Sequence, residues 1–190
     1  MKVTKEQSEQ NRQALLDAAA KLFKQHGIDG VGVADICKAA GLTHGALYKH
    51  FADKQDLAAQ AFAHSFRKGF DWTTQAGSGK TPTLATYLDQ YLSRHVRDDH
   101  ARGCPVVTSA CDTGRQSEPV SQSYTAGFLE LRDGLQAVLD PQGKDPAKAT
   151  LAVAALIGAM AISRGVVKTD PALANEVLKQ VRQQIEQLAD

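Results

Sequence analysis

Apolar residues recur every three or four positions through almost the whole chain, and this spacing restricts the fold more than any other feature. In one clear example, Val120, Tyr124, Phe128, Leu131 and Leu135 follow one another at steps of four, four, three and four. Such spacing places the side chains on one face of an α-helix, whereas a half-buried strand needs strict alternation. We therefore predict an all-α fold of about nine helices for the 190 residues.

Helix start and stop signals divide the chain. Gly27 and Gly41 follow apolar-periodic segments as C-terminal stops, whereas Thr43, Asp53 and Pro171 suit helix starts. Residues 75–82, QAGSGKTP, have the composition of a polar loop and form the most plausible domain seam. The predicted helices cover residues 6–26, 33–40, 43–51, 53–72, 84–96, 106–115, 119–138, 147–167 and 171–188.

Composition narrows the class of protein. The formal net charge is only +1, so the chain as a whole is not typical of a polyanion-binding protein. Three cysteines are too few for a disulfide framework and indicate a reducing compartment. The first residues lack a signal-peptide pattern, and the most apolar run, residues 149–162, is short for a membrane span of about 20 residues. We expect a soluble cytoplasmic protein without a membrane partner.

The segment GLTHGALYKHF, residues 41–51, follows a short helical segment and a longer one, an arrangement typical of a helix-turn-helix domain. The second helix of such a motif enters the DNA major groove, which has little spare room. Small side chains at Gly45 and Ala46 would let the backbone approach DNA closely, although glycine costs a helix about 1 kcal/mol. Leu47 and Phe51, four positions apart, would point into the domain core.

The remaining side chains of this segment would face outward, with donors for base edges and phosphates. Polarity alone would favour a plain helical hairpin whose polar residues are merely solvated. The short-helix, glycine-turn, short-helix spacing and the Gly-Ala pair instead favour a DNA-binding helix. The predicted DNA-binding residues are Thr43, His44, Gly45, Ala46, Tyr48, Lys49, His50 and Lys54.

Residues 33–57, VADICKAAGLTHGALYKHFADKQDL, resemble the signature of the TetR family of bacterial transcriptional regulators. The resemblance implies an N-terminal DNA-binding domain, a C-terminal ligand-binding and dimerisation domain, and repression relieved by a small molecule. It also implies DNA contacts from Thr43, Gly45, Tyr48, Lys49, His50 and Lys54. The chain departs from the family at Gly32-Val33, where Ser or Thr often caps the first helix of the motif. The matching positions are Ala40, Gly41, Gly45, Leu47, Tyr48, His50, Phe51, Lys54 and Leu57.

We expect a DNA-binding domain over residues 1–53 and a ligand-binding and dimerisation domain over residues 54–190. Small residues in the two C-terminal helices allow close helix approach, so these helices are the candidate interface of a homodimer. Such a dimer would bind a near-palindromic double-stranded operator. The predicted interface residues are Ala154, Ala155, Gly158, Ile162, Val177, Val181 and Ile185.

A pocket for a small-molecule effector is expected among the middle helices, although its predicted residues could equally belong to the core. Inward-facing aromatic and sulfur-containing side chains suggest a largely apolar ligand. The sequence indicates no cofactor. The predicted pocket residues are Phe66, Trp72, Tyr87, Tyr91, Cys104, Phe128 and Met160.

Cys104 precedes Pro105 and would lie at a helix N-terminus, where the helix dipole lowers the pKa of a thiol and Arg102 could add to the effect. In one branch of the family, regulators with a Gly-Cys-Pro element resemble sensors of oxidants or electrophiles, so release by thiol modification is a second hypothesis. A packed, unreactive cysteine is the simpler interpretation.

Three other interpretations are weaker. A cysteine-dependent enzyme would pair Cys104 with His95 or His100, but no carboxylate is placed to orient either histidine. A metal site built from the same three residues matches no familiar spacing. The segment AGSGKT is no phosphate-binding loop, since position 74 is Thr rather than the required Gly. An all-helical interaction module without DNA binding would require Tyr48 and Lys49 to be buried or paired.

Overall fold

The computed structural model describes residues 4–74, 83–140, 142–143 and 145–189. Within them the chain forms ten α-helices, two short 3-10 helices and no strand, which confirms the all-α prediction. The bounds are α1 Lys5–His26, α2 Val33–Ala40, α3 His44–Leu47, α4 Lys54–Thr74, α5 Leu84–Tyr91, α6 Arg94–Asp98, α7 Pro105–Ser109, α8 Glu118–Leu139, α9 Pro146–Val166 and α10 Pro171–Gln187, with 3-10 helices at His100–Arg102 and Thr113–Arg115.

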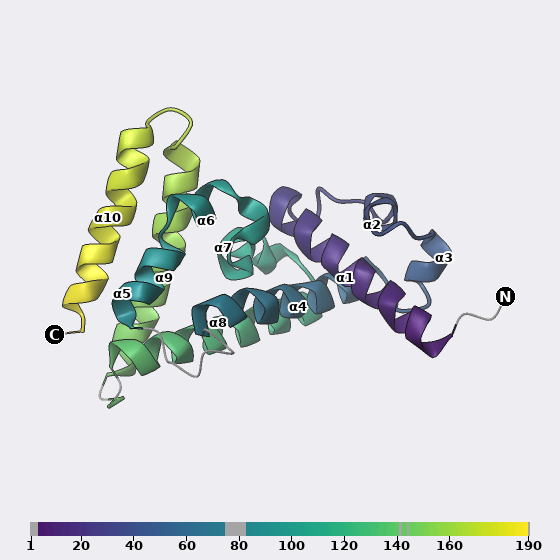
Figure 1. Cartoon of the computed structure of the whole chain (residues 1–190), viewed down its shortest axis with the longest axis horizontal. Coiled ribbons are helices and arrows are strands. Elements are labelled where there is room, and N and C mark those ends of the chain that lie inside the picture. The colour runs from purple at the N-terminus through teal and green to yellow at the C-terminus, as the bar shows by residue number, and fades with distance from the viewer. Residues whose placement is uncertain (1–3, 75–82, 141, 144, 190) are drawn as a thin grey trace.

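The molecule is elongated, with the first three helices at one end and the last two at the other (Figure 1). The long helices α4 and α8 run along the body between these ends, α6 and α7 lie near the middle, and α5 lies beside α9 and α10. The chain therefore separates its two termini by the full length of the molecule.

Two predicted helices are shorter than the sequence suggested. The expected helix over residues 84–96 is divided into α5 and α6, because Ser93 begins a new helix by accepting a hydrogen bond from the Val96 backbone N–H at 3.2 Å. The expected helix over residues 106–115 consists of α7 and a separate 3-10 turn. The predicted loop over residues 75–82 lies outside the described residues.

Two apolar cores lie at opposite ends, and α4 contributes to both. The N-terminal core includes Leu15, Ile36, Leu47 and Phe51 together with Leu57 from the start of α4. The C-terminal core is larger and joins α4 to α5 and α7–α10. Its buried members are Phe62, Phe66, Tyr87, Leu88, Tyr91, Leu92, Val106, Val107, Leu131, Leu135, Leu139, Ala152, Val153, Leu156, Ala159, Met160, Leu178 and Ile185.

A third, small core connects the two ends. It contains Ile28, Ala58, Ala59 and Val120, so the end of the first segment, α4 and α8 meet there. Nearby, α8 passes close to α4 at Gly127, where an added Cβ would lie 3.0 Å from the Phe62 ring. Because packed interiors transmit strain, this continuity couples the N-terminal end to the rest of the molecule.

Candidate nucleic-acid interface and ligand cavity

The turn between α2 and α3 has the geometry of a helix-turn-helix motif. Gly41 ends α2 in the left-handed region at φ 67°, a conformation that favours glycine. Thr43 then caps α3, since its hydroxyl accepts a hydrogen bond from the Ala46 backbone N–H at 3.3 Å. Ahead of α2, the Gly32 N–H donates to the Asp35 carboxylate at 3.1 Å, but no side chain at position 32 caps the helix as Ser or Thr would.

The inward and outward faces of α3 separate as expected. Leu47 is 0% exposed and Phe51 2%, so both anchor the motif to the N-terminal core. Tyr48 is 55% exposed and Lys49 is also exposed, and neither side chain forms a hydrogen bond or ion pair with another described residue. The α-helix itself is a single turn, and residues 48–50 continue it as a hydrogen-bonded turn. All eight predicted DNA-binding residues are at least partly accessible.

Packing inside the protein does not require a glycine at position 45. A Cβ added there would meet only the Thr43 hydroxyl oxygen, at 4.0 Å, and the residue is exposed. The protein therefore leaves open space above the start of α3, as close approach of DNA would require.

A cavity of about 730 Å³ lies between α1, α4, α5 and α6. This volume is within the range of about 300–1,000 Å³ usual for small-molecule sites. Its position matters because α1 and α4 also build the N-terminal core. The lining residues are Asp17, Ala20, Lys21, Lys24, His64, Ser65, Lys68, Asp89, Gln90, Ser93, His95, Val96 and Ala101.

Of the seven predicted pocket residues, the six whose side chains the structure describes do not line this cavity. Phe66, Tyr87, Tyr91 and Met160 are buried in the C-terminal core, and the partly buried Cys104 and Phe128 pack against it. The Tyr87 and Tyr91 rings stack with centroids 6.0 Å apart. The Trp72 side chain lies outside the described residues. The aromatic set thus forms part of the core behind the cavity, and its contact with an effector stays a prediction.

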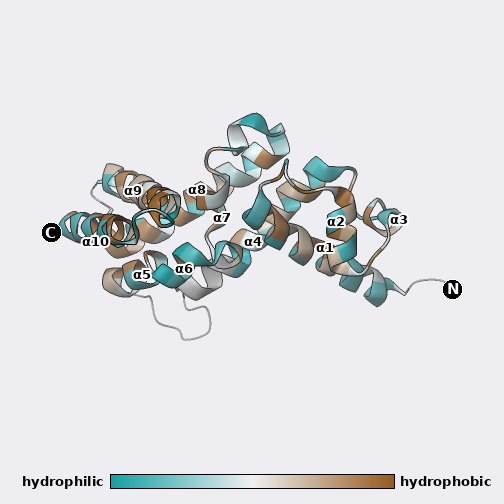
Figure 2. Ribbon diagram, turned by 90° about the horizontal axis from the view of Figure 1, so that it is seen from above, coloured by the Kyte–Doolittle hydropathy of each residue, from teal (hydrophilic) through white to brown (hydrophobic). Residues whose placement is uncertain are grey.

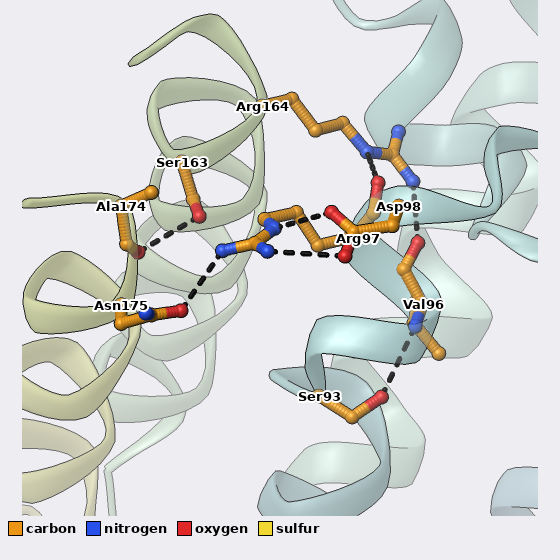
Figure 3. Close-up of polar contacts among 8 residues, drawn as sticks. All are labelled: Ser93, Val96, Arg97, Asp98, Ser163, Arg164, Ala174 and Asn175. Carbon is orange, nitrogen blue, oxygen red and sulfur yellow. Dashed lines mark hydrogen bonds and ion pairs between the residues drawn. The ribbon is translucent and has the colours of Figure 1, made fainter. Parts of the chain in front are cut away.

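Hydrogen bonds attach the α6 wall of the cavity to the two C-terminal helices (Figure 3). The Arg164 guanidinium donates to the carbonyl oxygens of Val96 at 2.9 Å and Arg97 at 3.0 Å. Arg97, which is 5% exposed, donates to the carboxylate of Asp98 and to Asn175 Oδ1 at 3.0 Å. Hydrogen bonds to α9 and α10 therefore hold α6 in position.

Cys104 lies at the N-cap of α7, as predicted, but the predicted direction of its pKa shift is wrong. Burial raises the pKa of the Cys104 thiol, and the Tyr91 hydroxyl, the backbone N–H groups of Val107 and Val106 and the Lys24 ammonium only partly offset this effect. The sequence could not show the burial, which outweighs the helix end. The packed-cysteine interpretation fits this environment better.

This pKa shift predicts slow alkylation of Cys104. Because a raised pKa leaves less thiolate at neutral pH, iodoacetamide at pH 7 should modify the exposed Cys111 at least about tenfold faster. Raising the pH to 9 should increase the Cys104 rate. Mass spectrometry of peptides after timed labelling measures both rates, and labelling in denaturant is the control. Modification of Cys104 ahead of Cys111 at pH 7 would contradict this expectation.

One face of α9 carries apolar side chains that the protomer leaves uncovered. Leu151 is 58% exposed and Ile162 is 55% exposed, and steps of three, four and four connect them through Ala154 and Gly158. Figure 2 shows α9 nearly end-on beside α10, with apolar residues in brown among its turns. By length and composition α9 could cross a membrane, with 39% of its most apolar window buried, but a single such helix is also typical of soluble protein cores.

The predicted interface residues differ in accessibility. Ala154 is exposed, whereas Ala155, Val177 and Val181 are partly buried. Ile185 is 1% exposed and packs inside the C-terminal core, so it is not accessible to a second protomer. Leu151 was missed, although its position on the same helical face as Ile162 was visible in the sequence.

The fold and the α2–α3 surface define a helix-turn-helix DNA-binding protein with a separate helical core. The chain belongs to the TetR family of bacterial regulatory proteins: the family model for the TetR-type DNA-binding segment matches residues 15–61. A second model, described as the LmrA/YxaF-like C-terminal domain of transcriptional regulators, matches residues 82–183. The protein is therefore a DNA-binding transcriptional regulator.

Sequence relatives carry the same description. The chain is 34% identical over 142 residues to the transcriptional regulator TtgR of Pseudomonas putida, a match covering 72% of this chain and 67% of TtgR. It is 46% identical over 57 residues to the regulator AcrR of Shigella flexneri, covering 30% of this chain and 26% of AcrR. These relatives are named as transcriptional regulators, not as enzymes.

The fold also matches solved structures. The crystal structure of reduced E. coli NemR superposes with a TM-score of 0.74 and 19% identity, covering 93% of this chain and 95% of NemR. At this identity the likeness extends to the fold alone.

Proposed function

We propose that this regulator is a cytoplasmic homodimeric repressor that binds a near-palindromic operator and releases it when a small molecule occupies the protein. The observation that carries the operator contact is the surface of α3. Its small residues and its polar residues face outward, while Leu47 and Phe51 anchor it to the N-terminal core. The eight predicted DNA-binding residues, which leave out Leu47, would then contact base edges and phosphates.

The α9 face supports the homodimer. Exposed Leu151 and Ile162, with the small residues Ala154 and Gly158 between them, suit a close helix contact with a second copy. Burying these side chains against the same face of a partner would remove apolar surface from water, which favours association. A two-fold dimer would present two α3 helices about 34–36 Å apart or somewhat more, matching successive major grooves.

The cavity supports control by a small molecule. Its walls come from α1 and α4, which build the N-terminal core, and from α6, which Arg164 holds to α9. A ligand that prefers one arrangement of these walls would shift the population of dimer conformations. Release follows if the preferred arrangement changes the separation of the two α3 helices. The domain division at residues 53 and 54 belongs to this proposal.

The other hypotheses have less support. An interaction module without DNA binding would require Tyr48 and Lys49 to be buried or paired, and both are exposed. Release by thiol modification is consistent with a fold like that of NemR, described in its reduced form, but burial raises the pKa of Cys104. We propose no enzymatic role, since the named relatives are regulators.

A mobility-shift titration with the DNA upstream of the protein's own coding region tests the proposal, since regulators of this family often control their own genes. We expect a discrete complex that survives competitor DNA at both low and high salt, with a size corresponding to a dimer. Weak binding that lost all sequence preference and fell steeply with salt would reflect phosphate contacts only and would contradict specific recognition of that DNA.

A further inference from the structure

Two buried oxygen atoms in the cavity wall lack a hydrogen-bond partner among the described residues. They are the Ser65 hydroxyl oxygen, on a residue that is 5% exposed, and the Gln90 side-chain oxygen. Buried polar atoms are nearly always paired, because leaving one unpaired is unfavourable. Both residues line the cavity, so a side-chain rotation would bring either unpaired oxygen to a bound molecule as a hydrogen-bond acceptor.

The two carboxylates in the cavity wall already form ion pairs within the protein. Asp17 lies 2.5 Å from the Lys68 ammonium and 2.7 Å from His64 Nε2. Asp89, on the opposite wall, forms an ion pair with Arg182. Neither carboxylate is therefore free to bind a ligand cation or to balance further positive charge in the cavity.

Two further lysines, Lys21 and Lys24, leave the cavity with an excess of positive charge. Both line it, and neither ammonium forms an ion pair or donates a hydrogen bond in the part of the chain that the structure describes. Burial lowers the pKa of Lys24, although Cys104 and Asp99 act in the opposite direction. An anion beside a poorly solvated ammonium would stabilise its charged form.

We propose that this cavity binds an organic anion with an apolar body and a hydrogen-bond donor, such as a hydroxylated aromatic carboxylate. Its carboxylate would pair with Lys21 and Lys24, and its hydroxyl would donate to the Gln90 oxygen. Its ring would lie against the apolar wall that includes Ala20 and Val96. The inference rests on the proposed function only in naming this anion as the effector; binding to the cavity is a separate property.

The test uses 6-hydroxy-2-naphthoate, its neutral amide and 2-naphthoate, titrated into the full-length protein without DNA by calorimetry. We expect the hydroxynaphthoate to bind about tenfold or more tightly than the amide, because charge-assisted hydrogen bonds are roughly twice as strong as neutral ones. 2-Naphthoate, which lacks the hydroxyl, should also bind more weakly than 6-hydroxy-2-naphthoate. Equal or tighter binding of the amide, or no binding of any probe, would overturn the proposal.

Variants locate the site. Lys24→Met should remove most of the preference for the carboxylate over the amide, since only the exposed Lys21 would remain to pair with it. Lys168→Met, which changes an exposed lysine outside the cavity, should leave the preference unchanged. Circular dichroism checks that both variants are folded, and a preference retained in Lys24→Met would place the anion elsewhere and refute this site. Operator binding is measured separately without any probe, so its absence would contradict the proposed function and leave the calorimetric result standing.

Discussion

Replacing Tyr48 and Lys49 together by alanine should lower specific operator affinity by about three orders of magnitude. Each side chain is exposed on α3, and a dimer would lose four contacts worth about 1 kcal/mol each. Fluorescence anisotropy with labelled operator measures the loss. Circular dichroism and sedimentation should show an unchanged fold and dimer, because neither side chain packs in the core.

Two further variants sharpen this experiment. Lys168→Ala removes an exposed lysine far from α3 in the sequence and should leave affinity unchanged. Gly45→Leu should weaken operator binding with no loss of thermal stability, since an added Cβ meets nothing closer than 4.0 Å within the protein. Operator affinity that survived both the double replacement and Gly45→Leu would remove α3 from the DNA interface.

A negative charge on the exposed face of α9 should separate the dimer. In Ile162→Glu, association would bury an unpaired carboxylate, which is strongly unfavourable. Analytical ultracentrifugation should detect monomers at concentrations where the unmodified protein is dimeric. Operator affinity should fall by about a hundredfold or more, because the second half-site would no longer be bound from the same molecule.

The matched control is Leu129→Glu on α8. Leu129 is also exposed, at 38%, but lies outside the α9 face, so the dimer should persist. A dimeric Ile162→Glu protein with normal operator affinity would exclude this face as the interface. Monomers from both variants would indicate a general effect of added charge.

Local signals in the sequence were sufficient for most helix boundaries. Gly27 and Gly41 end helices, and Thr43 begins one, because each acts through backbone conformation or a nearby hydrogen bond. The break before α6 was missed because Leu88, Leu92 and Val96 keep a helical spacing across it. The Ser93 cap was present in the sequence as a competing signal, but only the folded chain shows which signal prevails.

The DNA-reading surface was predictable for the same reason, since it comes from one continuous segment. The cavity was not, because its walls come from α1, α4, α5 and α6, which are distant in sequence. Lys21 and Lys24 look like ordinary solvated residues of an amphipathic helix. Conversely, Tyr87 and Tyr91 suggested a pocket by their aromatic character, but they pack inside the core.

The participation of α4 in both cores has a mechanical consequence. Its 21 residues make a rod of about 30 Å, rooted in the N-terminal core at Leu57 and packed along α8 further on. A tilt of only about 5° about one end would move the other end by about 3 Å. A displacement of this size would break a hydrogen bond, because hydrogen bonds tolerate only much smaller changes in length. The helix would thus act as a lever, so that a small adjustment around the cavity would suffice to lift α3 from the bases.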